Sequence, residues 1–275
     1  MLKSVFFERI RTQIDFCLRN EADCNMLKIL NNRGHKEKQM KILITNDDGI
    51  DSPLLKKLAV TAKQFGEVYV VAPDTQRSAV SHGFTYTRPI TVKEYPFGVE
   101  DVKAYSCDGL PADCVRVGIG NFVPGKPDLV LAGINHGYNI GADIQYSGTV
   151  AAAMEAAFVG VHAIAVSQGI HSDGRIADTY LSELLKECIE KPLERNRAWN
   201  INFPDCSFEE CKGIQRDCTV SKDLFYDDGY EVETNADGAS SYSIVARRIW
   251  KATPGTDLAA IIANYVSVGI VNNIG

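Results

Sequence analysis

The sequence lacks any apolar run long enough to cross a membrane. Its most apolar stretch, residues 150–166, falls short of the roughly 20 residues that a spanning helix needs, and Glu155 interrupts it. Charged residues within the first eleven positions also break up the N-terminus before a signal-peptide core of the usual length can form. We therefore expect a cytoplasmic protein without a membrane partner.

The sequence also lacks paired metal-binding cysteines and an excess of positive charge. None of its 8 cysteines forms a C-x-x-C pair, and no histidine lies at zinc-finger spacing from them, so we expect free thiols. The net charge of −6 argues against a nucleic-acid polymer as the main partner, because such proteins usually carry a basic face. The composition, 45% hydrophobic and 23% charged, is that of a globular protein.

The first part of the chain differs from the rest. Apolar residues recur every three or four positions from Phe6 to Leu18, which predicts a helix ending near residue 20, and the polar residues 31–39 predict a linker. We therefore expect an N-terminal extension over residues 1–39 and a main domain over residues 40–275. The extension is either an appended helix, the result of a start at an upstream methionine, or a helix that binds a partner or a second subunit.

From Met40 onward, short apolar strands alternate with helical patterns. The predicted strands are Lys41–Thr45, Val68–Ala72, Asp128–Ile134, His162–Ser167 and Asn200–Phe203, and the predicted helices are Pro53–Gln64, Pro111–Gly118, Thr149–Val159 and Ala177–Glu190. This alternation is typical of an α/β fold with a mostly parallel sheet covered by helices on both faces. After about residue 204 the pattern changes to polar and apolar alternation, which predicts antiparallel hairpins in a β-rich C-terminal part, residues 205–275.

Two adjacent carboxylates follow the first predicted strand. The segment Thr45–Gly49 reads TNDDG, and ligands of open α/β sheets bind beyond the carboxyl ends of the strands. Asp47 and Asp48 would repel each other if left unpaired, and Mg²⁺ or Mn²⁺ resolves that cost because both ions prefer oxygen ligands. The same letters also fit an ordinary Asp-Gly turn with a helix cap.

Two later loops add neutral oxygen groups and a helix start. The segment after the second strand, residues 72–85, carries several hydroxyls, and the segment 133–149 interleaves glycines with Asn and Asp. Ser147, Gly148 and Thr149 open an apolar helix, where free N–H groups and hydroxyls form an anion site, although Ser147 alone also suits a plain N-cap. Together the three loops predict a metal-assisted phosphate site.

These motifs resemble the SurE family of nucleotidases, the stationary-phase survival proteins. The resemblance covers about residues 40–268 and rests on Thr45–Gly49, Ala72-Pro73 with Ser78, Pro111–Cys114 and residues 133–149. It implies a Rossmann-like fold and a phosphomonoesterase that hydrolyses nucleoside 5′- and 3′-monophosphates through a metal-activated water, and short polyphosphate as well. It also implies a C-terminal arm that pairs subunits into a homodimer or homotetramer.

The resemblance assigns roles residue by residue. It implies one divalent ion, Mg²⁺ or Mn²⁺, as cofactor, and the assigned groups are the metal ligands Asp47, Asp48, Ser78 and Asn135, the phosphate-binding Ser147, Gly148 and Thr149, and the catalytic Asp47 and Asn139. As a mechanism we expect Asp47 to orient or deprotonate the attacking water, and Asn139 to touch the phosphate or orient a water.

The sequence departs from the family pattern in three places, and other functions stay open. The departures are the extension 1–39, Leu110 in place of the usual Thr before Pro-Ala-Asp, and an ending after Tyr265 without the usual Thr-Pro close. The alternatives are a phosphatase with an aspartyl nucleophile, which usually has two Asp two residues apart, and a non-catalytic metal or nucleotide sensor. His82 and His136 are candidate general acids that equally suit solvated or capping histidines.

Overall fold

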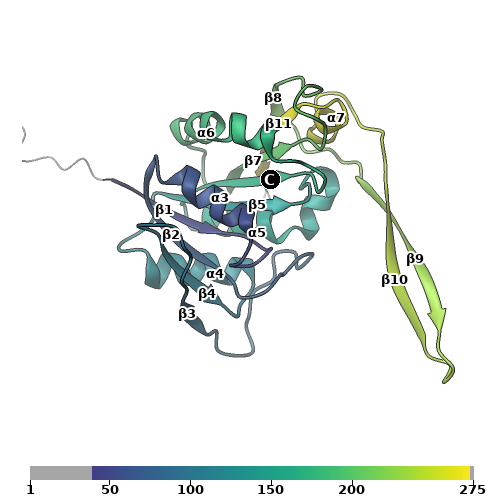
Figure 1. The fold of residues 1–275 in the computed structure, drawn as a ribbon, viewed down its shortest axis with the longest axis horizontal. Helices are drawn as coiled ribbons and strands as arrows, with labels where there is room; N and C mark the ends of the chain where they lie inside the picture. Colours follow the sequence, from purple (N-terminus) through teal and green to yellow (C-terminus); the bar gives the residue numbers. More distant parts are fainter. Residues whose placement is uncertain (1–38, 273–275) are drawn as a thin grey trace, which may run out of the picture. The chain divides into compact units, whose positions relative to one another are not determined.

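A nine-stranded sheet runs through the part of the chain that the computed structural model describes, residues 39–272 (Figure 1). Its order is β3 (Val92–Glu94), β4 (Lys103–Cys107), β2 (Gly66–Pro73), β1 (Met40–Thr45), β5 (Leu129–His136), β6 (His162–Gln168), β7 (Arg197–Phe203), β11 (Val266–Asn272) and β8 (Ile214–Cys218). The strands from β4 to β7 are all parallel, whereas β3 and β11 each run antiparallel to their inner neighbour. The expected helix near the N-terminus, the linker before Gln39, Cys17 and Cys24 lie outside the described residues.

Helices cover both faces of this sheet. Successive side chains of a strand point to opposite faces, so the apolar strands present a core to each layer of helices. In β1, Ile42 and Ile44 pack into the core under α3 (Pro53–Ala62) and α6 (Arg175–Glu190). Leu43 packs into the opposite core, under α4 (Pro111–Val117) and α5 (Gly148–Phe158). All three side chains are fully buried, which stabilises the fold by roughly 1.5–3 kcal/mol for each.

The predicted parallel α/β fold is therefore confirmed. Each strand and helix predicted from the alternation is present, with ends that coincide or differ by at most three residues. The helix predicted over Pro111–Gly118 ends at Val117, and a short π-helical segment, η1 (Gly118–Phe122), follows it. The edge strand β3 and its neighbour β4 were not predicted, because their short sequences mix charged and polar residues with few apolar ones.

The C-terminal part divides between the main sheet and a separate hairpin. β8 and β11 pair within the large sheet, so this region is not wholly an arm. β9 (Tyr226–Thr234) and β10 (Ser240–Arg248) form the two-stranded antiparallel hairpin that projects to the right in Figure 1. A small core that includes Tyr138, Phe225 and Leu258 joins the base of the hairpin to α7 (Asp257–Ile262).

Two further expectations concern membranes and thiols. Within residues 39–272, no helix combines the length and the apolar character needed to span a bilayer. The six cysteines in this range are free, as predicted, and four of them, Cys107, Cys114, Cys188 and Cys218, are buried.

Candidate active site

The polar segments predicted from sequence meet at the carboxyl ends of the three central strands. From β1 the chain passes to β2 and β4 on one side, and then returns to β5 on the other side of β1. Ligands of open α/β sheets bind where the direction of winding reverses in this way. Two backbone N–H groups tie the loops together there: that of Arg77 donates to the Asp47 carbonyl at 2.7 Å, and that of His136 donates to Asp48 Oδ2 at 3.0 Å.

Asp47 lies under the start of α5. The residue is only 4% exposed, and the Thr149 hydroxyl donates to its Oδ1 at 2.5 Å. A Cβ atom on Gly148 would lie 3.0 Å from Asp47 Cβ, so glycine permits this close approach. Burial, together with the charge of Asp48, raises the pKa of Asp47 to about 6, although the Thr149 bond opposes the rise.

Asp48 points away from α5 and toward β5. Its Oδ2 accepts the His136 backbone N–H, and the residue is half-buried. Burial raises its pKa above the ordinary value, while the contact with His136 lowers it. The two neighbouring carboxylates thus diverge, one held by the helix start and one by the strand end, and each keeps one oxygen outside these bonds.

The N-terminus of α5 offers donors to an anion. The Ser147 hydroxyl accepts the Val150 N–H at 3.0 Å, so Ser147 is an N-cap, one of the two interpretations that the sequence left open. Because its oxygen accepts in this bond, its hydroxyl proton remains available to donate. Gly148 and Thr149, as the first residues of the helix, present N–H groups that have no partner inside it. The Thr149 N–H also faces the Asp47 carboxylate and lowers its pKa. This is the arrangement that favours phosphate at a helix start.

Ser78 lies on the exposed loop after β2. Its hydroxyl accepts from the Gln76 side chain at 3.0 Å, and the Arg77 backbone next to it is bonded to Asp47. Farther along the loop, the Ser81 N–H donates to the Tyr146 carbonyl at 3.0 Å, which ties the loop to the segment before α5. Ser78 therefore lies at the same end of the sheet as the two aspartates.

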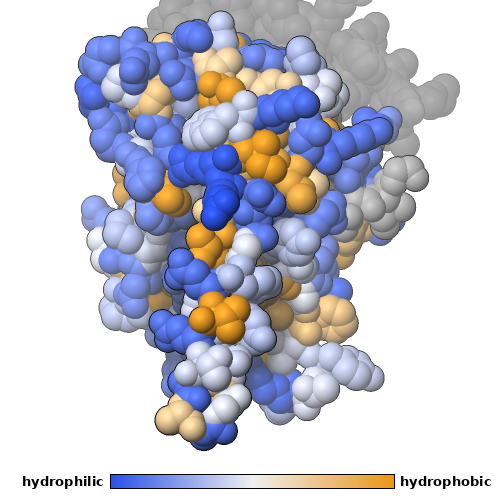
Figure 2. All heavy atoms as spheres, turned by 90° about the vertical axis from the view of Figure 1, so that its right-hand side faces the viewer, coloured by the Kyte–Doolittle hydropathy of each residue, from blue (hydrophilic) through white to orange (hydrophobic). Residues whose placement is uncertain are grey.

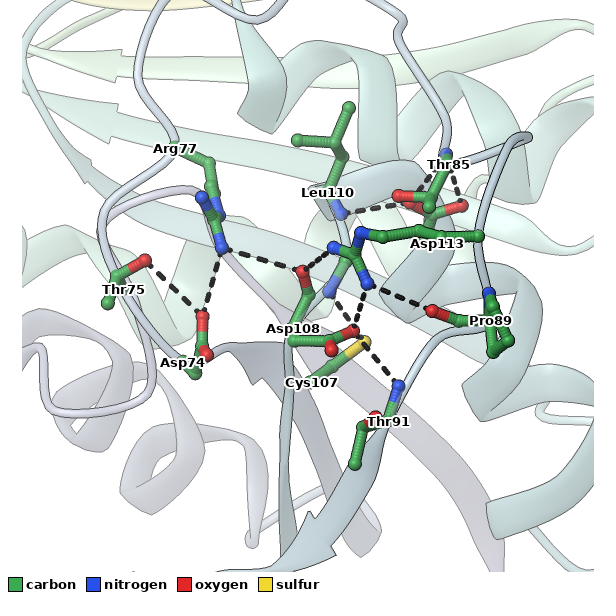
Figure 3. Close-up of polar contacts among 12 residues, drawn as sticks. Asp74, Thr75, Arg77, Thr85, Pro89, Thr91, Cys107, Asp108, Leu110 and Asp113 are labelled. Carbon is green, nitrogen blue, oxygen red and sulfur yellow. Dashed lines mark hydrogen bonds and ion pairs between the residues drawn. The ribbon is translucent and has the colours of Figure 1, made fainter.

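Residues from β4 to α4 hold this loop in place (Figure 3). The guanidinium of Arg77 donates to Asp74 and to the Asp108 carbonyl, so it bridges the loop and the end of β4. The buried Asp113 accepts the N–H groups of Thr85 and Leu110, at 3.0 Å or less. The Asp of the Pro-Ala-Asp motif therefore anchors the loop and caps α4 through its own carboxylate. Leu110, the departure from the family pattern, takes part in this cap through its backbone N–H.

Asn135 and Asn139 lie in different surroundings. Asn135, in β5, donates from Nδ2 to the Gly137 carbonyl at 2.9 Å, which leaves its side-chain oxygen for another partner. Asn139 is buried, and its side chain donates to the Ser167 hydroxyl at 2.7 Å. Its backbone is fixed by Asn202, which both accepts from its N–H and donates to its carbonyl. The hydrogen bonds of Asn139 are thus to β6 and β7, not to Asp47.

The two candidate histidines make protein contacts. His82 Nε2 lies 2.9 Å from Oε2 of the buried Glu155, and its ring stacks on Phe158 at 5.4 Å between centroids. Arg116 pairs with the same carboxylate at 2.7 Å, and together these partners lower the pKa of Glu155 against the effect of burial. His136 Nε2 lies 3.0 Å from the Ile170 carbonyl. Sequence reasoning missed the Glu155 ion pairs, because a glutamate within an apolar helical pattern gives no sign of its partner.

The donor set suits a hard divalent cation. Within residues 39–272 there is no group of three or more His, Cys, Asp or Glu that could hold a metal. A cation at this site would have to combine the free carboxylate oxygens of Asp47 and Asp48 with the neutral oxygens of Ser78 and Asn135. Carboxylate, hydroxyl and amide oxygens are the ligands that Mg²⁺ and Mn²⁺ prefer, and the raised pKa values mark a place where positive charge would be favourable.

Fold and site together define a Rossmann-like α/β protein with two adjacent aspartates at its switch point, one facing a helix N-terminus and the other the end of β5. The chain belongs to the SurE family: residues 42–225 match the family described as "Survival protein SurE". It is 37% identical over 235 residues to a protein of Geobacter sulfurreducens named 5′-nucleotidase SurE, covering 83% of this chain and 86% of that one. It is 39% identical over 235 residues to a protein of the same name from Clostridium botulinum, covering 83% and 91%.

A solved structure confirms the fold. The crystal structure of the SurE protein from Aquifex aeolicus superposes with a TM-score of 0.71 at 33% sequence identity. The match covers 86% of this chain and 94% of that one. The family predicted from the short motifs is therefore confirmed over most of the chain.

Proposed function

We propose that the protein is a phosphomonoesterase that hydrolyses nucleoside 5′-monophosphates to nucleoside and phosphate. The observation that carries this proposal is the 2.5 Å bond between Thr149 and Asp47, which brings the first aspartate of the pair against the helix start that suits a phosphate. The relatives named 5′-nucleotidase support the same activity. Hydrolysis of 3′-monophosphates and of short polyphosphate belongs to the proposal as well.

The proposed cofactor is one divalent ion, Mg²⁺ or Mn²⁺, held by Asp47, Asp48, Ser78 and Asn135. When bound, such an ion neutralises charge on the phosphate and lowers the pKa of a water molecule. The fit of the oxygen donors and the unfavourable burial of two adjacent carboxylates support this assignment.

Each residue around the site has a separate role in the proposed hydrolysis. Gly148 would donate its backbone N–H and Ser147 its hydroxyl proton to the phosphate oxygens, with the Thr149 N–H placed between the phosphate and Asp47. Asp47 would take a proton from the attacking water as the water oxygen bonds to phosphorus. The bond between phosphorus and the ester oxygen breaks, and that oxygen leaves with the nucleoside and takes a proton from solvent. Asn139, held rigidly by Ser167, would act at the edge of this pocket, on the phosphate or on a water.

The first test measures phosphate release from AMP, GMP, UMP and 3′-AMP with Mg²⁺, with Mn²⁺ or with EDTA. We expect release that needs the metal and that disappears in the Asp48→Ala variant. Asp228→Ala is the matched control, because this carboxylate is exposed on β9, opposite Ala246 in the hairpin. A folded wild-type protein that releases no phosphate from any nucleotide with either metal would refute the proposal.

We also infer that the β9–β10 hairpin pairs with a second copy of the chain in a homodimer, or in a tetramer built from such dimers. Tyr230, Val232, Tyr242 and Ile244 lie on one face of the hairpin, where Tyr242 is opposite Val232 and Ile244 is opposite Tyr230. All four side chains are more than half exposed. In Figure 2, which views this side of the molecule, apolar residues interrupt the hydrophilic surface along the projecting hairpin. Exposed apolar patches of this kind mark interfaces.

A further inference from the structure

We propose that the cleft beside Asp48 binds the nucleoside part of the substrate, and that the side-chain amide of Gln168 is its buried polar contact. This inference rests on the proposed nucleotidase function and assigns the part of the site that recognises the base and ribose. The cleft has a volume of about 440 Å³, and its lining includes Asp48, Pro53, Leu54, Gln76, His136 and Gln168. Pockets for small ligands occupy roughly 300–1,000 Å³, so a nucleoside fits in size.

Gln168 is the first reason for this assignment. It is only 4% exposed, and its side-chain oxygen has no hydrogen-bond partner among the described residues. An unpaired buried amide costs roughly 1–3 kcal/mol, so such a group in the wall of a cleft points to a ligand that completes the bond. Its backbone cannot move away, because it pairs with His136 and Phe203, and its carbonyl accepts the Gly137 N–H at 2.8 Å.

The position of the cleft relative to the phosphate site is the second reason. Asp47 faces the start of α5, whereas Asp48 turns toward His136 and lines the cleft. A phosphate at the N-terminus of α5 therefore lies on one side of the carboxylate pair, and the cleft opens on the other. A phosphomonoester that bridges the pair would extend its organic group over Asp48 into the cleft.

The chemistry of the lining is the third reason. Pro53 and Leu54, at the start of α3, form an apolar wall against which the face of a heterocyclic base can pack. The amides of Gln76 and Gln168 can each donate and accept, as the edges of a base require. Within the described residues, the lining contains no Lys or Arg. The cleft therefore suits an uncharged nucleoside better than the further phosphates of a polyphosphate chain.

The test compares two substrates in the Gln168→Leu variant. AMP carries a nucleoside, whereas p-nitrophenyl phosphate offers the same ester chemistry without base or ribose. We expect kcat/KM for AMP to fall about ten-fold, mostly through KM, because an uncharged hydrogen bond to the substrate is lost. For p-nitrophenyl phosphate kcat/KM should stay at the wild-type value. Gln64→Leu is the matched control, since this exposed glutamine lies just before β2, at the opposite end of the sheet.

A second variant, Leu54→Ala, keeps the test independent of the buried amide. It shortens the apolar wall without disturbing the strand ends, so AMP turnover should again fall while p-nitrophenyl phosphate turnover is kept. Equal losses on both substrates in both variants, or no loss on either, would overturn the proposal. A wild-type protein that hydrolyses p-nitrophenyl phosphate but no nucleotide would instead refute the nucleotidase function itself, which keeps the two failures distinct.

Discussion

The switch-point site and the β9–β10 hairpin depart from the usual distribution of side chains in opposite ways. At the site, Asp47 and Thr149 are polar and almost fully buried. On the hairpin, Tyr230 and Ile244 are apolar and 63% and 64% exposed. A buried polar group and an exposed apolar patch are the two informative exceptions in a folded protein. One region is arranged for chemistry and the other for association.

The two regions also differ in what they cost the isolated chain. Burying the Asp47 carboxylate next to Asp48 raises the free energy of the ionised folded state, as its raised pKa records. Because the apolar face of the hairpin stays exposed, the isolated chain lacks the stabilisation of about 25 cal/mol for each Å² of apolar surface that burial would provide. Both costs are removed by something that binds, a cation and an anion at the site and a second chain at the hairpin. The predictions below separate these two effects.

The largest expected effect is on the site. Thr149→Val keeps the shape of the side chain but removes the hydroxyl that donates to Asp47 at 2.5 Å. We expect kcat/KM for AMP to fall by roughly 10²–10³-fold, because Asp47 loses its orientation at the helix start. Steady-state kinetics measure this, with Thr61→Val as the control, since that hydroxyl donates only to the Lys57 carbonyl in α3. A variant as active as the wild type would show that the Thr149 bond is purely structural.

The sequence predicted the central fold well and its edges poorly. The apolar runs of β1, β2, β5 and β6 are buried on both faces, so their composition alone identifies them. β3 and β4 could not be found in this way, because β3 lies at the edge and both strands are short and carry exposed polar side chains. The pairing of β11 between β7 and β8 was also beyond prediction, since a strand's partners depend on contacts that are distant in sequence.

The candidate site was predictable where residues follow strand ends and unpredictable where they pair at a distance. Asp47, Asp48 and Asn135 follow from the rule that ligands bind beyond the carboxyl ends of strands. The same rule could have singled out Gln168, at the end of β6. By contrast, the pairing of Asp113 with Thr85, and of Glu155 with His82, joins residues 28 and 73 positions apart. Neither partner carries a local sequence signal for the other.

The second expected effect is on the hairpin. Replacing both Tyr230 and Ile244 with Lys places two charges side by side on its apolar face. We expect at least about 30-fold weaker self-association, since charged residues are depleted from interface cores. Light scattering coupled to size exclusion, over a concentration series, measures it.

A matched double variant checks that the apolar face is responsible. Ser241→Lys with Ser243→Lys adds the same charge on the opposite face, where these residues are opposite Glu233 and Glu231. We expect its self-association to equal that of the wild type, and AMP turnover per folded chain to change less than in the Thr149 variant. Equal weakening by both double variants would place the interface elsewhere on the molecule.

The smallest expected effect is on stability: a change at Asp47 that should remove activity should also raise the free energy of unfolding. Because the pKa of Asp47 is about 6 in the folded protein and 3.8 in the unfolded chain, the folded state binds more protons between these values. Stability therefore falls as pH rises from about 4 to 6, and the deficit persists above pH 6 in metal-free protein. Asp47→Asn removes the charge, so in EDTA at pH 8 we expect it to raise the free energy of unfolding by about 1–2 kcal/mol.

Urea denaturation at pH 4 and pH 8 tests this, because the gain should vanish at pH 4, where wild-type Asp47 is already protonated. Asp227→Asn, on the exposed hairpin, is the control and should gain nothing at either pH. Adding Mn²⁺ should stabilise the wild type at pH 8 and reverse the order of the two proteins, since the cation favours the charged carboxylate that Asn lacks. An Asp47→Asn variant that is less stable than the wild type in EDTA would mean that the Thr149 bond outweighs the cost of burying the charge. The site would then be stable without an ion, and only the hairpin would remain a region whose cost is removed by binding.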